Sequence, residues 1–292
     1  MLLKDILITM RPNQWTKNFL LFAGLIFSGK MTNLPDVLVS VQAFIVFCLG
    51  SSSIYILNDI IDRENDRGHP QKRLRPIAAG QITVPVALSL AGSLLIFSIV
   101  LSIRYLNVAL IDTFFTYLLL MACYIFVLRR VVILDLIVVA VGFVLRAIAG
   151  AVVLKVAISP WLMICTFFLA LLVLMGKRRH EILLLGKEAY AHRSILKEYS
   201  LGFIDQLIAV VTSSAVISYS LYTFSEDTVA RLGTNLMPLT IPFVLYGIFR
   251  YLYLTHQQNQ GGAPEELFVN DKALLVNGFL WVAAAVAILY FT

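Results

Sequence analysis

The sequence predicts an all-α integral membrane protein, a bundle of nine transmembrane helices. Of its 292 residues, 60% belong to the hydrophobic set and only 14% are charged, whereas soluble domains carry about 25% charged residues. The apolar residues form long continuous runs, each near the length of about 20 residues that a helix needs to cross a bilayer. Transmembrane β-barrels show shorter, alternating segments instead. This composition excludes a soluble enzyme, a disordered chain and a disulfide scaffold.

Polar breaks divide the apolar residues into nine runs. They cover residues 15–32, 36–57, 82–103, 107–127, 131–154, 159–177, 204–224, 234–255 and 272–291. Before them, the apolar positions of residues 1–10 recur at helical spacing. This segment is expected either to lie at the membrane interface as an amphipathic helix or to begin the first span. No linker interrupts the pattern, so we expect a single domain over residues 1–292.

The basic residues predict how the bundle is oriented. With the N-terminus inside the cell, 18 of the 23 lysines and arginines fall in cytoplasmic segments, four fall on the opposite face, and Arg146 lies within a span. This asymmetry satisfies the positive-inside rule. It predicts a multi-pass protein of the inner (plasma) membrane whose N-terminus and main polar loops are cytoplasmic. Anionic lipid explains the net charge of +6, so no nucleic-acid partner is expected.

The polar segment 58–81, after the second run, carries the main candidate site. Asn58, Asp59, Asp62 and Asp66 share one face if the helix continues past the membrane. Crowded carboxylates repel one another unless something neutralises them, and Mg²⁺ accepts such oxygen ligands together with substrate phosphates. We therefore predict that Asp59, Asp62 and Asp66 are catalytic ligands of Mg²⁺ and that Asn58 contacts the substrate. The alternative is an ordinary solvated helix end.

Three basic residues follow the aspartates. Lys72, Arg73 and Arg75 lie between Pro70 and Pro76, which should break the helix and allow the loop to fold back over the carboxylates. Ammonium and guanidinium groups at this place would hold the negative charge that remains on a metal-bound diphosphate. Without the aspartates, the three residues would indicate only a positive-inside anchor.

Candidates for substrate binding also occur in the first and fifth runs. Asn13 and Lys17 are one helical turn apart at the mouth of the first run, where they would point at the site or anchor the chain at the interface. Arg146 lies within the fifth run, where an unpaired guanidinium costs at least about 2.5 kcal/mol on insertion scales. We expect Arg146 to face the bundle interior and to meet a carboxylate or a phosphate, in a structural or a substrate-binding role.

The motif formed by Asn58, Asp59, Asp62 and Asp66 resembles the NDxxDxxxD motif of the UbiA superfamily of intramembrane prenyltransferases, which form nine-helix bundles. Segments 11–18, 75–80 and 142–150 are similar to one branch, the decaprenyl-phosphate phosphoribosyltransferases. The resemblance implies Mg²⁺-dependent transfer of phosphoribose from phosphoribosyl pyrophosphate (PRPP) to a polyprenyl phosphate, with release of pyrophosphate. It also implies a substrate contact for Tyr124 and Arg129, because superfamily members place a Tyr and a basic residue at this span end.

The polar segment 177–203 departs from the wider superfamily. Members that use a prenyl diphosphate carry a second aspartate-rich motif here, whereas this segment has no DxxxD spacing. Its basic character suits anions that arrive without their own metal, such as the 5-phosphate of PRPP or a lipid monophosphate, although topological charge explains much of it. We take four of its residues as candidate substrate contacts: Lys177, Arg178, Glu181 and Tyr199. Alternative functions are a prenyltransferase that joins a polyprenyl diphosphate to a small acceptor, and a transporter or lipid-binding protein.

Overall fold

Helices follow one another along the whole chain in the computed structural model, which describes residues 2–68, 70–157, 159–185, 194–262, 267 and 270–291. The α-helices are α1 (Leu2–Met10), α2 (Phe22–Phe27), α3 (Leu34–Ile61), α4 (Arg63–Gly68), α5 (Val84–Tyr105), α6 (Val108–Phe126), α7 (Leu134–Val153), α8 (Pro160–Leu185), α10 (Leu201–Phe224), α11 (Glu226–Leu232), α12 (Ile241–His256) and α14 (Lys272–Phe291). Short 3₁₀ segments are η1 (Pro12–Leu21), η2 (Lys72–Leu74), η3 (Leu128–Arg130), η5 (Ser194–Glu198) and η6 (Met237–Thr240).

Eight helical segments of the described chain are long and apolar enough to cross a membrane: α3, α5, α6, α7, α8, α10, η6 with α12, and α14. They correspond to the last eight of the nine apolar runs. The expected all-α membrane bundle is therefore confirmed. A ninth span stays a prediction, because the first run forms two shorter segments rather than one long α-helix.

The first apolar run forms the 3₁₀ segment η1 followed by the short helix α2. Pro12 begins η1, and polar side chains are spread around it. The indole of Trp15 donates to Ser52 Oγ at 3.0 Å, and Asn18 Nδ2 donates to Ser51 Oγ at 3.4 Å, both on α3. Long 3₁₀ segments have poorer internal hydrogen bonds than α-helices. Contacts with α3 therefore shape this segment more than its own backbone ladder does.

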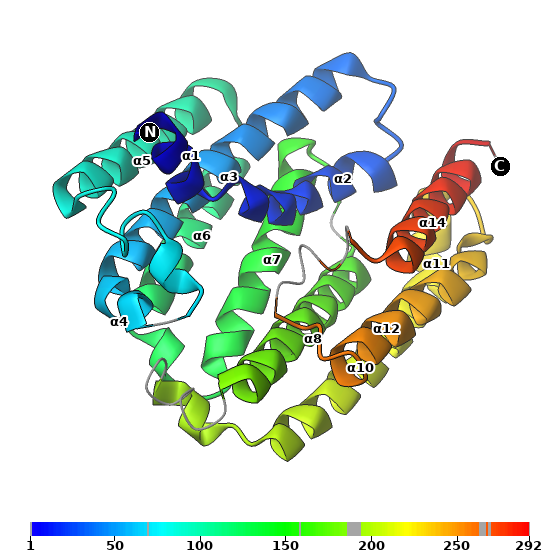
Figure 1. The fold of residues 1–292 in the computed structure, drawn as a ribbon. Coiled ribbons are helices and arrows are strands. Elements are labelled where there is room, and N and C mark those ends of the chain that lie inside the picture. The colour runs from blue at the N-terminus through cyan, green and yellow to red at the C-terminus, as the bar shows by residue number, and fades with distance from the viewer. Residues whose placement is uncertain are drawn as a thin grey trace.

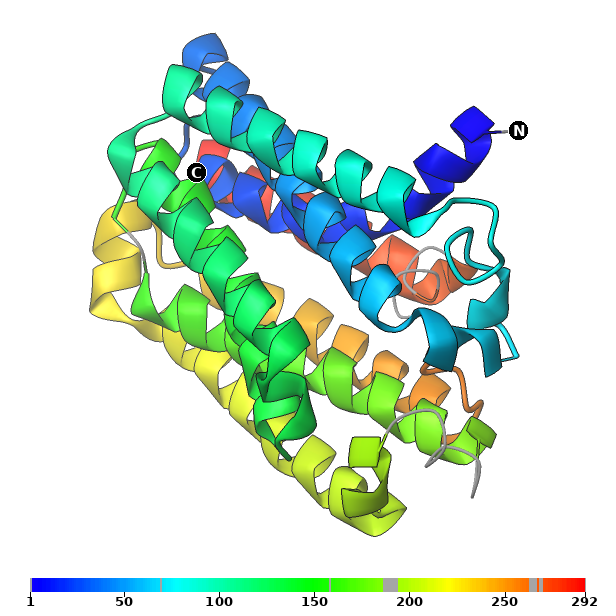
Figure 2. The ribbon, with the colours of Figure 1, turned by 90° about the vertical axis from the view of Figure 1, so that its left-hand side faces the viewer.

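Helix α7 joins the two halves of the bundle (Figures 1 and 2). In Figure 2 the blue and cyan helices of the first half lie above the yellow and light-green helices of the second half. Val138 and Ala149 of α7 belong to a core cluster shared with α3 and α6. Leu136 and Ala140 of α7 belong to a second cluster shared with α8, α10 and α12. The two faces of one helix therefore hold together two separate cores, and the site described below lies at the end of this helix.

Gly150 permits η1 to lie directly against α7. A Cβ atom at Gly150 would lie 1.9 Å from the backbone oxygen of Leu21, and a Cβ at Gly24 would lie 2.5 Å from the backbone oxygen of Gly150. Neither approach leaves room for a methyl group. The missing side chains therefore set the position of η1, which carries Lys17 into the site.

Gly150→Ala is expected to destabilise the fold by about 1–3 kcal/mol, as overpacking in a well-packed core does. The backbone of η1 must move to accept the new methyl group, and the position of Lys17 moves with it. Thermal unfolding of the purified protein in detergent checks the change. Gly92→Ala on α5 is the matched control, because a Cβ there meets no atom within 4 Å. An unfolding midpoint for Gly150→Ala equal to that of the control would contradict the packing argument.

Candidate active site

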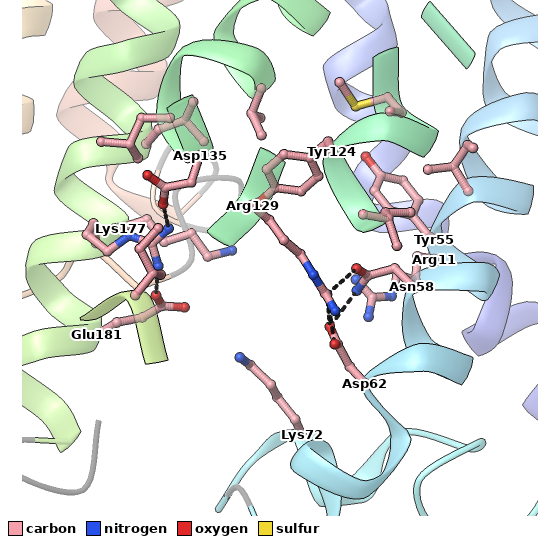
Figure 3. Close-up of a pocket in the computed structure, with 18 of the residues that line it drawn as sticks. Arg11, Tyr55, Asn58, Asp62, Lys72, Tyr124, Arg129, Asp135, Lys177 and Glu181 are labelled. Carbon is pink, nitrogen blue, oxygen red and sulfur yellow. Dashed lines mark hydrogen bonds and ion pairs between the residues drawn. The ribbon is translucent and has the colours of Figure 1, made fainter. Parts of the chain in front are cut away.

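A pocket of about 660 Å³ opens where α3, α6 and α8 end and α7 begins (Figure 3). It brings together twelve of the side chains singled out in the sequence: Lys17, Asn58, Asp62, Asp66, Lys72, Arg75, Tyr124, Arg129, Arg146, Lys177, Arg178 and Glu181. These residues come from η1, α3, α4, the η2 loop, α6, η3, α7 and α8. Segments that are far apart in the sequence therefore converge on one cavity with many charged groups.

Asp62 lies at the break between α3 and α4. Helix α3 ends at Ile61, Asp62 is its C-cap, and α4 starts at the next residue. Arg129 Nη1 donates to Asp62 Oδ1 at 2.7 Å, and Asn58 Nδ2 donates to Asp62 Oδ2 at 3.1 Å. Asn58 and Asp62 thus remain neighbours on the pocket side despite the break. Figure 3 shows Arg129 reaching across to both of them.

The other two aspartates are almost completely buried, and arginines neutralise them. Asp59 is ion-paired with Arg11, whose guanidinium meets both carboxylate oxygens, and with Arg75 at 3.1 Å. Arg75 also contacts Asp66 Oδ2 at 2.5 Å. The loop after Pro70 therefore folds back over the carboxylates as the sequence predicts, and Arg75 is the basic residue that reaches them. Asp66 lines the pocket, whereas Asp59 lies behind Arg11 and outside the lining.

The side-chain oxygens at the end of α3 and on α4 are suitable ligands for Mg²⁺. Asn58, Asp62 and Asp66 present amide and carboxylate oxygens to one pocket, and Mg²⁺ is usually bound through one or two carboxylates plus substrate phosphates. In the described ranges, no three His, Cys, Asp or Glu side chains converge closely enough to hold a metal by themselves. The residues therefore fit a metal that arrives with a phosphate ligand, with Asp62 and Asp66 as the carboxylates of the motif that line the pocket. A direct role of Asp59 in metal binding stays a prediction.

The opposite wall is organised around Arg178 of α8. Its guanidinium donates to Asp135 Oδ2 at 2.5 Å and to Glu181 Oε2 at 2.8 Å. Tyr199 donates its hydroxyl hydrogen to Asp135 Oδ1 at 2.6 Å, and the hydroxyl accepts from the backbone N–H of Ile133 at 2.7 Å. Burial and the hydrogen bond to Asp135 raise the pKa of Tyr199. The phenol therefore stays protonated at neutral pH and remains a donor to Asp135.

Arg146 lies at the deep end of the pocket. It is 3% exposed and donates to Asn18 Oδ1 at 2.7 Å, to the backbone oxygen of Gly142 at 2.8 Å and to Tyr117 Oη at 2.8 Å. Its guanidinium also lies 4.6 Å from the centre of the Tyr117 ring. Arg146 faces the interior as expected, but its recorded partners are neutral groups rather than a carboxylate. Through Asn18 it also fastens η1 to α7.

A comparison with known protein families matches residues 19–270 to the UbiA prenyltransferase family. The chain belongs to this family. Two relatives of this UbiA-family protein are both called decaprenyl-phosphate phosphoribosyltransferase. The relative from Mycolicibacterium smegmatis is 33% identical over 100% of this chain and 94% of its own length. The relative from Corynebacterium glutamicum is 34% identical over 96% of this chain and 85% of its own length.

Solved structures show the same fold for this UbiA-family chain. A UbiA homologue from Archaeoglobus fulgidus, bound to GPP and Mg²⁺, has a TM-score of 0.72 at 18% identity and covers 98% of this chain and 99% of its own. A digeranylgeranylglyceryl phosphate synthase structure has a TM-score of 0.65 at 19% identity and covers 99% of both chains. At these identities the likeness concerns the fold.

The pocket of this UbiA-family protein does not include every residue that the sequence suggested. Asn13 and Arg73 are exposed and lie outside the lining, and Tyr199 lies behind Asp135 rather than at the cavity surface. Arg11 lines the pocket but was not among the sequence candidates. The feature of the sequence that could have identified Arg11 is its position two residues before the candidate Asn13. Its partner Asp59 is 48 residues away, a separation at which no helical spacing applies.

Proposed function

We propose that this protein transfers 5-phosphoribose from PRPP to a polyprenyl phosphate and releases pyrophosphate. The charge of the pocket carries the proposal: among the described residues, nine lysines and arginines line it against four carboxylates. PRPP and a lipid phosphate together bring a 5-phosphate, a diphosphate and a monophosphate to one site. Nine cationic side chains can balance the negative charge of these phosphate groups. The activity for which the two bacterial relatives are named supports the same assignment.

The alternative is a prenyltransferase that joins a polyprenyl diphosphate to a small acceptor. The Archaeoglobus homologue, bound to GPP and Mg²⁺, supports a metal-assisted diphosphate site in this fold. A prenyl diphosphate brings only one diphosphate, however, and the wall formed by Lys177 and Arg178 adds cations where such enzymes are expected to carry aspartates. The pocket therefore favours the phosphoribosyl donor.

One side of the pocket, the α3 wall, includes Asp62, Asp66, Arg75 and Arg129. These residues explain how pyrophosphate departs. Displacement at the anomeric carbon builds negative charge on the leaving group, and fixed positive charges around it lower the barrier. Bound Mg²⁺ would add further charge stabilisation, with Asp62 and Asp66 as its protein ligands. Arg75 and Arg129 lie against these carboxylates, so phosphate oxygens entering the pocket can take over their hydrogen bonds. The lipid phosphate is already anionic near neutral pH, so the attack needs no strong general base.

We further propose that the pocket faces the cytoplasm of a cell bounded by the inner (plasma) membrane and that residues 1–292 act as one domain. The positive-inside distribution of the lysines and arginines supports this orientation. A long isoprenoid tail is soluble only in the bilayer, whereas PRPP is soluble only in water. A site at one end of the spanning helices allows the two substrates to meet.

The test is an assay of the purified protein with polyprenyl phosphate, PRPP and Mg²⁺, followed by pyrophosphate release. We expect turnover that stops when EDTA removes the metal and returns when Mg²⁺ is added in excess. A parallel assay supplies a polyprenyl diphosphate and an aromatic acceptor. Turnover in the second assay alone would overturn the phosphoribosyl proposal and leave the family assignment intact. Full activity in EDTA would overturn the metal requirement.

A further inference from the structure

The two walls of the pocket differ in their charge balance. The α3 wall and its loops supply Arg11, Lys17, Lys72, Arg75, Arg129 and Arg130 against Asp59, Asp62 and Asp66. The α7–α8 wall supplies Arg146, Lys177 and Arg178 against Asp135 and Glu181. The first wall therefore has an excess of three positive charges and the second an excess of one. Phosphate groups are attracted mainly to the first wall, and the carboxylates of the second wall suit a different part of the substrate.

Arg178 is held by protein groups on both sides. Its side chain is 5% exposed, and Asp135 and Glu181 both accept hydrogen bonds from it at 2.5–2.8 Å. A buried arginine between two carboxylates has little remaining charge to offer a phosphate. Its role is to orient the two carboxylates. A direct contact between Arg178, which also lines the pocket, and the substrate stays a prediction.

Both carboxylates line the pocket, but of the two only the side chain of Glu181 has accessible surface. The side chain of Asp135 is 0% exposed, because Tyr199 and Arg178 cover its two oxygens. The side chain of Glu181 is 17% exposed and lines the pocket. Figure 3 shows Glu181 and Asp62 on opposite sides of the cavity. Glu181 is therefore the carboxylate that a ligand on this wall would meet.

An ionised carboxylate accepts hydrogen bonds and repels phosphate. The ribose of PRPP offers hydroxyl groups that are hydrogen-bond donors, and hydrogen bonds to a charged acceptor are the strong ones. We propose that Glu181 binds the ribose hydroxyls of the donor and that Arg178, Asp135 and Tyr199 position it. The inference rests on the proposed function and deepens it. Glu181 is then a specificity residue, because a prenyl diphosphate has no hydroxyl to donate to it.

The first test compares the wild type with Glu181→Gln in the full-length protein. Glutamine keeps an oxygen that accepts from Arg178 but removes the negative charge. We expect kcat/KM for PRPP to fall roughly 10- to 100-fold, mainly through KM. The inhibition constant of pyrophosphate, which has no ribose, should change by no more than about twofold. Equal weakening of PRPP and pyrophosphate would overturn the proposal, because Glu181 would then act on the phosphates or on the fold.

The second test uses PRPP analogues that lack the 2-hydroxyl or the 3-hydroxyl of the ribose. The wild type should discriminate against at least one of them, and Glu181→Gln should lose most of that preference, as a double-mutant cycle requires. Glu198→Gln is the matched control, since Glu198 is an exposed carboxylate outside the pocket lining, and it should keep the wild-type preference. If the wild type and Glu181→Gln discriminate equally between PRPP and the deoxy analogues, the proposal is overturned.

Tyr199→Phe tests the positioning role. Loss of the hydroxyl removes the donor to Asp135 Oδ1 and leaves the bond from Arg178 to Oδ2, so KM for PRPP should rise while kcat and the pyrophosphate inhibition constant stay near wild type. A parallel change in KM, kcat and the pyrophosphate inhibition constant would show that Tyr199 has a structural role only.

If the Glu181→Gln protein does not fold, Glu181→Asp gives the same comparison with the charge retained and the reach shortened. A wild type that does not use PRPP at all would refute the proposed function, whereas a wild type that does, with unaltered variants, refutes this inference alone.

Discussion

Asp62→Ala is expected to abolish phosphoribosyl transfer and to leave the bundle folded. Asp62 is the most exposed of the three aspartates, with 22% of its side chain accessible, and its carboxylate lies between Asn58 and the guanidinium of Arg129. Removing a ligand of the metal that would stabilise the leaving pyrophosphate should cost about 10²- to 10³-fold in kcat/KM. Because Asp62 is partly solvated, its loss leaves no fully buried charge behind. Pyrophosphate release and thermal unfolding in detergent measure the two effects separately.

Two other aspartates provide the comparison for Asp62→Ala. Asp227→Ala on α11 removes an exposed carboxylate that pairs with Arg231, and its activity should equal that of the wild type. Asp59→Ala should lower both activity and stability, because Asp59 is 3% exposed and its removal takes the carboxylate partner from Arg11 and one of two from Arg75. Activity of Asp62→Ala that is retained at saturating Mg²⁺ would contradict the assignment of Asp62.

Asp135→Ala is expected to cause the largest loss of stability, about 3–5 kcal/mol, which is typical when one partner of a buried ion pair is removed. Asp135 is 1% exposed, and its two oxygens accept from Arg178 and Tyr199. Without them, a buried guanidinium keeps only Glu181 as its carboxylate partner, and the Tyr199 hydroxyl loses its acceptor. Because these bonds tie α7 to α8 and to the segment before α10, unfolding should begin at this end of the bundle.

Thermal unfolding and proteolysis of the purified protein check this prediction. The double variant Asp135→Ala with Arg178→Met should lose less stability than the single variant, since the stranded charge is removed and a side chain of similar length refills the space. The exposed pair of Asp227 and Arg231 is again the control, because surface ion pairs contribute only about 0–1 kcal/mol. If Asp135→Ala is as stable as the wild type, Asp135 does not stabilise the contacts of α7 with α8 and Tyr199.

Much of the fold follows from local patterns in the chain. Eight of the nine apolar runs became spanning helices because length and continuous hydrophobicity are properties of each run by itself. The first run forms η1 and α2 rather than one long helix, and Asn18 ties it to Ser51 of α3 and to Arg146 of α7. The acidic motif and the folding back of the loop after Pro70 were also predictable, since helix periodicity and proline geometry act over a few residues.

The sequence by itself determined that the protein is a helical membrane bundle and that acidic and basic groups gather at its polar ends. Only the tertiary structure decided which charges meet. Arg146 meets Asn18 at a separation of 128 residues, and Arg178 meets Asp135 at a separation of 43. The physical reason is that an ion pair depends on how helices pack and how deeply each group is buried, and neither quantity is encoded in the spacing of residues along one helix. Both Asp135 and Glu181 line the cavity, and burial separates them, because the side chain of Asp135 is 0% exposed and that of Glu181 is 17% exposed.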